Sequence, residues 1–220
     1  RLQTDFGRFA PTAVVDRIAA RGPVDAERRE VTVLFADLVA FTALSETLSP
    51  EVLVGVLNGY FDRVTQAISA HRGHVSKFIG DGLMALFGAL EPNPWQANDA
   101  VHAALAARQV LQSYNAELAA RALPALQVGI GIHRGDAIAG LVGNQSLMEF
   151  TVIGPTVNLA SRVEALTRTY QVDILITEAV RAALDPRFQV EARPPANLRG
   201  VAEPVRTWAV LGFDDRPTVT

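Results

Sequence analysis

Runs of apolar residues divide this chain into predicted strands separated by turns and helices. Residues 31–36 (VTVLFA) form a β-branched apolar run, and residues 75–79 and 83–87 form shorter runs on either side of Gly80-Asp81-Gly82. Gly-Asp-Gly is strong turn chemistry because glycine accepts positive φ at no steric cost. The pattern predicts a buried strand and, later in the chain, a β-hairpin that carries Asp81 at its tip.

Apolar residues at helical spacing predict helices between these strands. Ser49, Pro50 and Glu51 supply an N-cap, a proline at the first helical position and a first-turn acid, and this helix ends at Arg72-Gly73. Residues 97–118 carry a longer amphipathic pattern. Elsewhere the chain predicts strands at 126–132, 172–176 and 205–210, helices at 156–167 and 178–184, a short helix at 11–18, and an irregular glycine-rich segment at 140–154.

The order of these elements favours an α+β fold. A strand, a helix, a hairpin, a helix and a strand are followed by further helices and strands. This alternation is typical of a ferredoxin-like split βαβ sandwich, in which helices pack on an antiparallel-rich sheet. We interpret residues 1–29 as a charged lead-in, residues 30–212 as the domain and residues 213–220 as a tail.

Composition narrows the classes of function. The 220 residues are 49% hydrophobic with a net charge of -3, which is ordinary for a globular domain. The chain has no overall excess of positive charge of the kind that binds nucleic acid. The absence of cysteine excludes disulfides and thiolate chemistry and suits the cytoplasm. No apolar run is long enough to span a bilayer, so we expect no membrane contact from this segment. Because the sequence begins with Arg1, we expect a piece of a longer protein, fused to an upstream sensor or membrane region.

Two aspartates end apolar strands that a split βαβ sheet places side by side. Asp37 follows the strand at 31–36, and Asp81 lies at the hairpin tip. Carboxylate oxygens suit Mg²⁺ or Mn²⁺, and two such ions can clamp the attacking and leaving oxygens of a phosphoryl transfer. The alternative is structural: Asp37 caps a loop and Asp81 fills a turn position.

Other polar side chains are open to a similar choice. Asn158 and Arg162 are four residues apart, so on a helix they share one face that suits phosphate oxygens or that is simply solvated. Lys77 lies in an apolar strand, where its ammonium binds a base, a phosphate or a structural acid, or reaches the surface. His74 and His133 are interpreted as strand-end polar residues, and no Ser/His/Asp pattern indicates a hydrolytic triad.

Four ordered stretches resemble the catalytic domain of class III nucleotidyl cyclases, the adenylate and guanylate cyclases. They are VTVLFADLVAFT at 31–42, KFIGDGLMA at 77–85, VGIGIHRG at 128–135 and FTVIGPTVNLASR at 150–162, with a weaker match, NLRGVAEPVRTW, at 197–208. The resemblance runs from about residue 30 to residue 211. It implies a lyase that converts ATP to 3′,5′-cyclic AMP and pyrophosphate.

The resemblance also implies metal and purine contacts. Asp37 and Asp81 match the family's metal aspartates, with the carbonyl of Leu38 as a further ligand, and they imply two divalent cations, Mg²⁺ or Mn²⁺. Lys77 and Thr151 match the residues that read the purine. An ammonium suits the N1 acceptor of adenine, whereas guanine presents an N–H there and is met by Glu in guanylate cyclases. ATP is therefore the expected substrate.

Phosphate and ribose contacts follow from the same motifs. Asn158 and Arg162 match the pair that orients the ribose and stabilises charge on the α-phosphate. Backbone amides around Phe41 and Thr42, near the start of a helix, suit the β- and γ-phosphates. Where some members carry a triphosphate-binding lysine, this chain has Val201, and the candidate replacements are Arg199 and Arg206. Phe150 stands where Tyr is commoner, which we interpret as a packing change.

The family pairs two catalytic domains head to tail. One partner supplies the aspartates, and the other supplies the Lys, Thr, Asn and Arg set. Because this chain carries both sets, we expect a homodimer with two equivalent composite sites. The alternatives are a guanylate cyclase of the same fold and a catalytically silent nucleotide-binding regulatory module. Such modules usually lack an aspartate or the Asn/Arg pair, and this chain has all four residues.

Overall fold

The computed structural model describes residues 25–144 and 148–215, so the predicted helix at 11–18 lies outside the described residues. The strands are β1 (Glu27–Leu38), β2 (His74–Ile79), β3 (Gly82–Phe87), β4 (Val128–Gly143), β5 (Met148–Ile153), β6 (Ile174–Thr177), β7 (Phe188–Ala192) and β8 (Thr207–Phe213). The helices are α3 (Phe41–Thr47), α4 (Pro50–Ala70), α5 (Gln96–Ala120), α6 (Pro155–Tyr170) and α7 (Glu178–Arg181).

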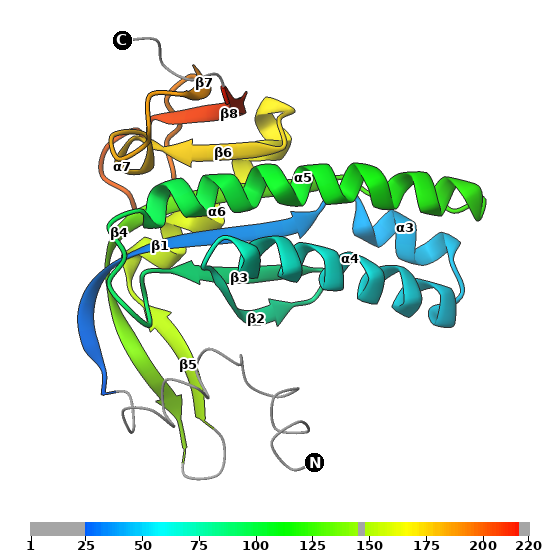
Figure 1. Cartoon of the computed structure of the whole chain (residues 1–220), viewed down its shortest axis with the longest axis horizontal. Coiled ribbons are helices and arrows are strands. Elements are labelled where there is room, and N and C mark those ends of the chain that lie inside the picture. Colours follow the sequence, from blue (N-terminus) through cyan, green and yellow to red (C-terminus); the bar gives the residue numbers. More distant parts are fainter. Residues whose placement is uncertain (1–24, 145–147, 216–220) are drawn as a thin grey trace.

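These strands form one mixed sheet in the order β2-β3-β1-β4-β6-β8-β7, and β5 pairs with β4 off this path (Figure 1). β1 and β4 pair antiparallel along their length, from Glu27 opposite Ala139 to Leu38 opposite Val128. β4 and β6 run parallel. The predicted α+β fold is confirmed, including the prediction that β1 lies beside the β2–β3 hairpin.

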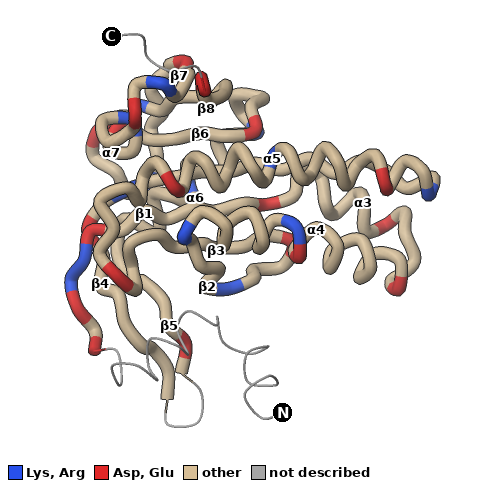
Figure 2. The backbone as a smooth tube through the Cα atoms, in the orientation of Figure 1, with Lys and Arg blue, Asp and Glu red and all other residues tan. Residues whose placement is uncertain are grey.

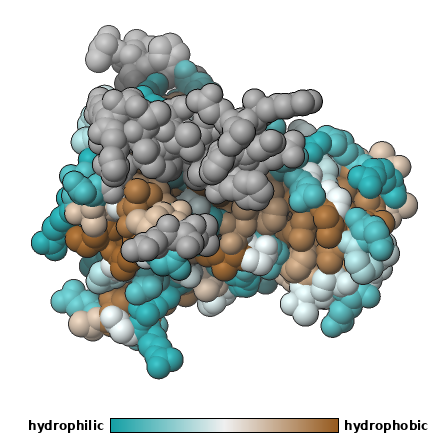
Figure 3. Space-filling view, turned by 90° about the horizontal axis from the view of Figure 1, so that it is seen from below, coloured by the Kyte–Doolittle hydropathy of each residue, from teal (hydrophilic) through white to brown (hydrophobic). Residues whose placement is uncertain are grey.

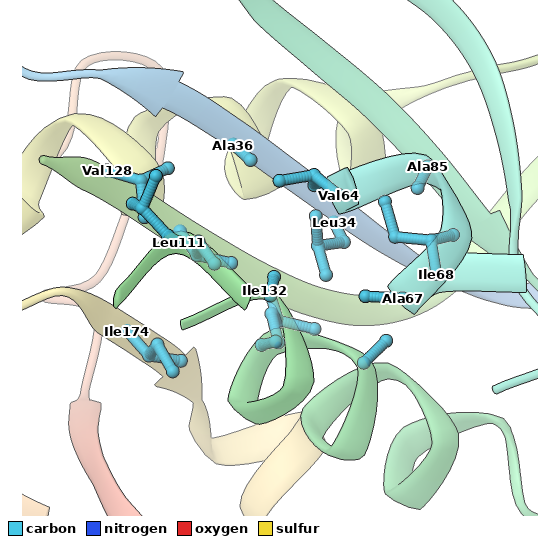
Figure 4. Close-up of a cluster of buried hydrophobic side chains, with 14 of the residues drawn as sticks. Leu34, Ala36, Val64, Ala67, Ile68, Ala85, Leu111, Val128, Ile132 and Ile174 are labelled. Carbon is cyan, nitrogen blue, oxygen red and sulfur yellow. The ribbon is translucent and has the colours of Figure 1, made fainter. Parts of the chain in front are cut away.

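Helices cover both faces of the sheet because β1 is apolar on both sides. Leu34 and Ala36 belong to the core under α4 and α5, whereas Val31 and Val33 pack on the opposite face with Ala160 of α6. Figure 4 shows the first of these cores, in which side chains of α4 and α5 meet those of β1, β3, β4 and β6. Each fully buried aliphatic side chain of this kind stabilises the fold by about 1.5–3 kcal/mol.

The start of α4 has the predicted cap. Ser49 precedes the helix with extended backbone, and its side chain accepts a hydrogen bond from the backbone N–H of Val52. Pro50 opens the helix, where its missing N–H costs nothing, and Glu51 adds an acid to the first turn.

The prediction of an irregular segment at 140–154 is wrong. β4 continues to Gly143, and β5 returns along it with Gly140 opposite Thr151. A Cβ on Gly140 would lie 2.6 Å from the Cα of Ala26, so this glycine permits a close approach of the chain before β1. A glycine-rich sequence is equally compatible with a loop and with such contacts.

Some boundaries also differ from prediction. β1 begins at Glu27 because the charged stretch before residue 31 pairs with the far half of β4, which apolar patterning does not reveal. β7 was not predicted, β8 runs from Thr207 to Phe213 rather than over 205–210, and α7 ends at Arg181 rather than at 184.

Acidic and basic residues are interspersed along the described chain (Figure 2). Within the described ranges, no helix has the length and apolar character to cross a membrane.

Candidate active site

The ends of β1 and of the hairpin bring two carboxylates together. Ala36 pairs with Leu83 in the sheet, which places Asp37 beside Gly82. A Cβ on Gly82 would lie 2.7 Å from Oδ1 of Asp37 and 2.9 Å from the carbonyl oxygen of Ala36. Gly82 is therefore needed for close approach as well as for the turn, and it allows Asp37 to lie next to Asp81.

The Asp37 carboxylate affects the protonation of Asp81. Burial is the largest effect that raises the pKa of Asp81, and the neighbouring Asp37 carboxylate raises it further. The backbone N–H of Asp81 and the positive charge of Arg168 oppose this rise in pKa. Two neighbouring carboxylates favour a cation between them, because a cation relieves their repulsion.

Arg168 is a member of this site that the sequence analysis missed. One of its Nη atoms lies 2.7 Å from Oδ2 of Asp37, and the other lies 2.7 Å from Oε1 of Glu164. Burial raises the pKa of Glu164 to about 7, against the lowering effect of Arg168. The spacing of Glu164 and Arg168 predicts their own ion pair on α6. No local pattern predicts the contact with Asp37, which lies 131 residues earlier.

Two glycines of β4 allow α6 to reach the aspartates. A Cβ on Gly131 would lie 2.1 Å from the backbone nitrogen of Glu164, and one on Gly129 would lie 2.3 Å from Oγ1 of Thr167. α6 therefore rests directly on the backbone of β4. The glycines in VGIGI serve this packing.

Lys77 and Thr151 come together on neighbouring segments of β2 and β5. Thr151 is 6% exposed, and its Oγ1 lies 3.4 Å from Oγ of Ser76, the residue before Lys77. The ammonium of Lys77 lies 3.0 Å from Oε1 of Glu149, two residues before Thr151. The contact of β2 with β5 therefore carries both a cationic donor, Lys77, and a buried hydroxyl, Thr151.

Phe150 and the two histidines have structural surroundings. Phe150 is buried, and its ring lies 5.6 Å from that of His74, which agrees with a packing role. His74 begins β2 as predicted, but His133 lies inside β4 because that strand continues to Gly143. Nδ1 of His133 is 2.8 Å from Oγ1 of Thr177.

Asn158 and Arg162 lie on α6, with Asn158 exposed and Arg162 half-buried. A Cβ on Gly200 would lie 3.5 Å from Nη1 of Arg162, so the loop that carries Arg199 passes beside this guanidinium. Arg206 is exposed just before β8, and its backbone oxygen accepts a hydrogen bond from the backbone N–H of Glu178.

The segment after β1 provides further backbone groups near Asp37. α3 begins at Phe41, after Ala40 in a left-handed conformation with φ 57°. The first-turn N–H groups of Phe41 and Thr42 have no partner inside the helix by geometry. Leu38 is the buried last residue of β1.

The donor set at the end of β1 fits hard divalent cations. No cluster of three or more His, Asp or Glu residues able to hold a metal occurs within residues 25–144 and 148–215. The side-chain ligands available are therefore Asp37 and Asp81. Mg²⁺ is commonly held in this way, by one or two carboxylates with substrate phosphates and waters completing the shell.

The fold and the aspartate pair indicate a domain of the phosphoryl-transfer class. The chain belongs to the adenylate and guanylate cyclase catalytic domain family, whose model matches residues 24–212. An adenylate cyclase of Anabaena cylindrica is 39% identical over 184 residues, covering 80% of this chain and 36% of that protein. Adenylate cyclase 1 of Rhizobium meliloti is 34% identical over 185 residues, covering 84% of this chain and 28% of that protein. The chain thus spans well under half of these curated relatives.

Solved structures of both substrate types resemble this chain. The guanylyl cyclase Cya2 matches with a TM-score of 0.81 and 32% identity, over 89% of this chain and 98% of that one. The adenylyl cyclase CyaB from P. aeruginosa matches with a TM-score of 0.81 and 27% identity, over 87% and 98%. Because both purines are represented, the choice between them rests on the residues of this chain.

Proposed function

We propose that this domain is an adenylate cyclase that converts ATP to 3′,5′-cyclic AMP and pyrophosphate. The observation that carries the proposal is the contact of β2 with β5, where Ser76 meets the buried hydroxyl of Thr151 and Lys77 pairs with Glu149, in a chain that also brings Asp37 and Asp81 together. The names of the relatives in Anabaena cylindrica and Rhizobium meliloti support the same substrate.

The adenine ring is read by a donor and an acceptor. Lys77 donates to N1 of adenine, and Thr151 accepts from the exocyclic amino group. Guanine presents an N–H at N1, which an ammonium cannot satisfy. Lys77 is held by Glu149 at 3.0 Å before nucleotide binds, so Glu149 shares or releases the ammonium when the purine arrives.

Asp37, Asp81 and the carbonyl of Leu38 would hold two divalent cations, Mg²⁺ or Mn²⁺. When bound, these ions lower the pKa of the ribose 3′-hydroxyl and neutralise the triphosphate. The 3′-hydroxyl loses its proton to water, its oxygen forms a bond to the α-phosphorus, and the bond from that phosphorus to the pyrophosphate oxygen breaks in line with it.

The other residues position the ribose and the phosphates. Asn158 orients the ribose, and Arg162 stabilises the charge that develops on the α-phosphate. Backbone N–H groups of Phe41 and Thr42 face the β- and γ-phosphates. Arg199, in the loop beside Arg162, takes the place of the triphosphate lysine of some relatives.

We expect the active form to be a head-to-tail homodimer. β4 and β5 extend from the body of the sheet as a two-stranded arm (Figure 1). Large apolar side chains are exposed on this arm and at the hairpin tip, namely Ile138, Val142, Met148, Ile153, Phe78 and Ile79. Brown apolar residues remain visible between polar ones on the face seen from below (Figure 3). Exposed apolar side chains gathered in this way mark protein interfaces.

The purified domain, incubated with Mn²⁺ and either ATP or GTP, tests this proposal. Chromatography of the products should show cyclic AMP from ATP and much less cyclic GMP from GTP. The rate per protomer should rise with protein concentration as dimers form. Cyclic GMP as the main product would favour a guanylate cyclase, and no cyclic product from either nucleotide would favour a silent module.

A further inference from the structure

Ser76 occupies an unusual position in β2. The register between β2 and β3 shifts after Val75, which pairs with Ala85, so that Lys77 pairs with Met84. Ser76 is therefore the additional residue of a β-bulge. Bulges redirect side chains and are over-represented next to active sites. Here the bulge leaves Ser76 buried, at 9% exposure, on the side of β5.

Ser76 makes two polar contacts with β5. Its Oγ lies 3.1 Å from the carbonyl oxygen of Phe150 and 3.4 Å from Oγ1 of Thr151. A serine hydroxyl has a single proton, and a carbonyl oxygen can only accept. The proton of Ser76 therefore goes to Phe150, the nearer partner. The second contact is then a hydrogen bond only when Thr151 donates its own proton to Ser76.

This direction has a consequence for purine recognition. We propose that Ser76 is a positioning residue that determines substrate specificity, by holding the Thr151 hydroxyl as an acceptor toward the purine. The exocyclic amino group of adenine donates to such an acceptor, whereas O6 of guanine can only accept and would face it unpaired. The inference rests on the proposed adenylate cyclase function. It assigns part of the choice of purine to Ser76, which does not touch the base, in addition to Lys77 and Thr151, which do.

Without Ser76, the Thr151 hydroxyl is free to rotate. It can then accept from adenine or donate to O6 of guanine, so one of the barriers to GTP disappears. Lys77 still disfavours the N1–H of guanine, and the loss of selectivity is therefore partial. A single hydrogen bond changes discrimination by about five- to tenfold.

The test measures kcat/KM for ATP and for GTP in Ser76→Ala, with Ser113→Ala as a matched control on the exposed surface of α5. Ser76→Ala should lower the ratio of ATP to GTP efficiency about five- to tenfold, and Ser113→Ala should leave it unchanged. Ser76→Thr keeps the hydroxyl and should keep the ratio. In a Thr151→Val background, Ser76→Ala should no longer change the ratio, since no hydroxyl remains to be oriented.

A purely structural role of Ser76 gives a different result. Activity with both nucleotides would then fall by the same factor in Ser76→Ala, with a lower melting temperature and an unchanged ratio, and this would overturn the inference. Nucleotide preference is also measured without turnover, as the ratio of the dissociation constants for GTP and ATP in the presence of Ca²⁺. If the wild-type domain makes no cyclic product, the proposed activity is refuted. If it nevertheless binds ATP more tightly than GTP, and Ser76→Ala reduces that preference, the role of Ser76 stands. Equal binding of both nucleotides by wild type and variant would refute that role.

Discussion

Arg168 compensates part of the negative charge at the aspartate site. Its guanidinium joins Asp37 to the buried Glu164, with both contacts at 2.7 Å. A cation that binds the aspartates must share Asp37 with this guanidinium or displace it. Arg168 therefore competes with metal for the same carboxylate.

Replacing Arg168 should tighten metal binding. At about 4 Å, two unit positive charges repel by about 1 kcal/mol in water, and more where solvent is partly excluded. Arg168→Gln keeps a hydrogen-bond donor for Glu164 but removes the charge. We expect the dissociation constant of Mn²⁺, titrated without nucleotide, to fall about fivefold. Arg193→Gln removes an ion-paired arginine next to β7 and is the control. Weaker Mn²⁺ binding by Arg168→Gln would show that Arg168 assists the metal.

Lys77 offers a direct chemical probe because it is the only lysine in the sequence. An amine-directed reagent therefore modifies Lys77 and the amino terminus. Bound adenine should cover the ammonium, so ATP with Ca²⁺ should slow the modification of Lys77 severalfold more than GTP does. Peptide mass spectrometry measures both amines, with the amino terminus as the internal reference. Equal rates with and without ATP would remove Lys77 from the purine site.

At the scale of elements, the contact of α6 with β4 positions the site. Arg168 reaches Asp37 while it pairs with Glu164, because Gly129 and Gly131 leave no side chain between the helix and the strand. This packing also fixes the direction in which Asn158 and Arg162 point, since all four residues lie on one helix. The geometry of the site thus depends on residues that have no chemical function of their own.

Gly131→Ala should be strongly destabilising. Its Cβ would lie 2.1 Å from the backbone nitrogen of Glu164, so the helix must move off the strand. Overpacking of this kind costs about 1–3 kcal/mol, and we expect the upper end because the contact is with backbone. Gly55→Ala on α4 is the control, because nothing lies within 4 Å of its Cβ. That change should stabilise the helix by roughly 0.5–1 kcal/mol in urea unfolding. Similar urea midpoints of unfolding for Gly131→Ala and Gly55→Ala would show that α6 does not rest on the backbone of β4.

The elements differ in how far the sequence predicts them. β1, the hairpin and α4 carry strong local signals, namely an apolar run, a Gly-Asp-Gly turn and a Ser-Pro-Glu cap. The arm formed by β4 and β5 does not, because Gly140 serves a close contact with Ala26 that exists only after the sheet has formed. The same reason explains the missed residues. Ser76 and Arg168 act through partners in β5 and β1, which lie far away in sequence.

Across the whole molecule, a buried histidine, His74, and a half-buried one, His133, make stability dependent on pH. Burial lowers the pKa of His74 and that of His133 to about 4 each, from an ordinary value of 6.5. The folded state therefore binds fewer protons than the unfolded state between pH 6.5 and 4. The contribution of these two histidines to stability therefore falls as the pH falls through that window. Glu164, with its pKa raised to about 7, acts in the opposite direction below pH 7.

His74→Leu isolates one of these effects. From the two pKa values, His74 costs the folded state up to about 2 kcal/mol more at pH 5 than at pH 7. The free energy of unfolding in urea, measured at both pH values, should therefore fall less in His74→Leu than in wild type. An unchanged difference would mean that His74 is protonated in the folded protein.

A mixing experiment tests whether this chain forms cyclase sites shared between two copies. Asp37→Ala and Arg162→Ala should each be nearly inactive alone. With random exchange, half of the dimers are mixed and each mixed dimer keeps one intact site, so the mixture should regain about a quarter of wild-type cyclic AMP formation. A mixture that stays inactive, although both variants are folded and mixed dimers are detected, would contradict the account.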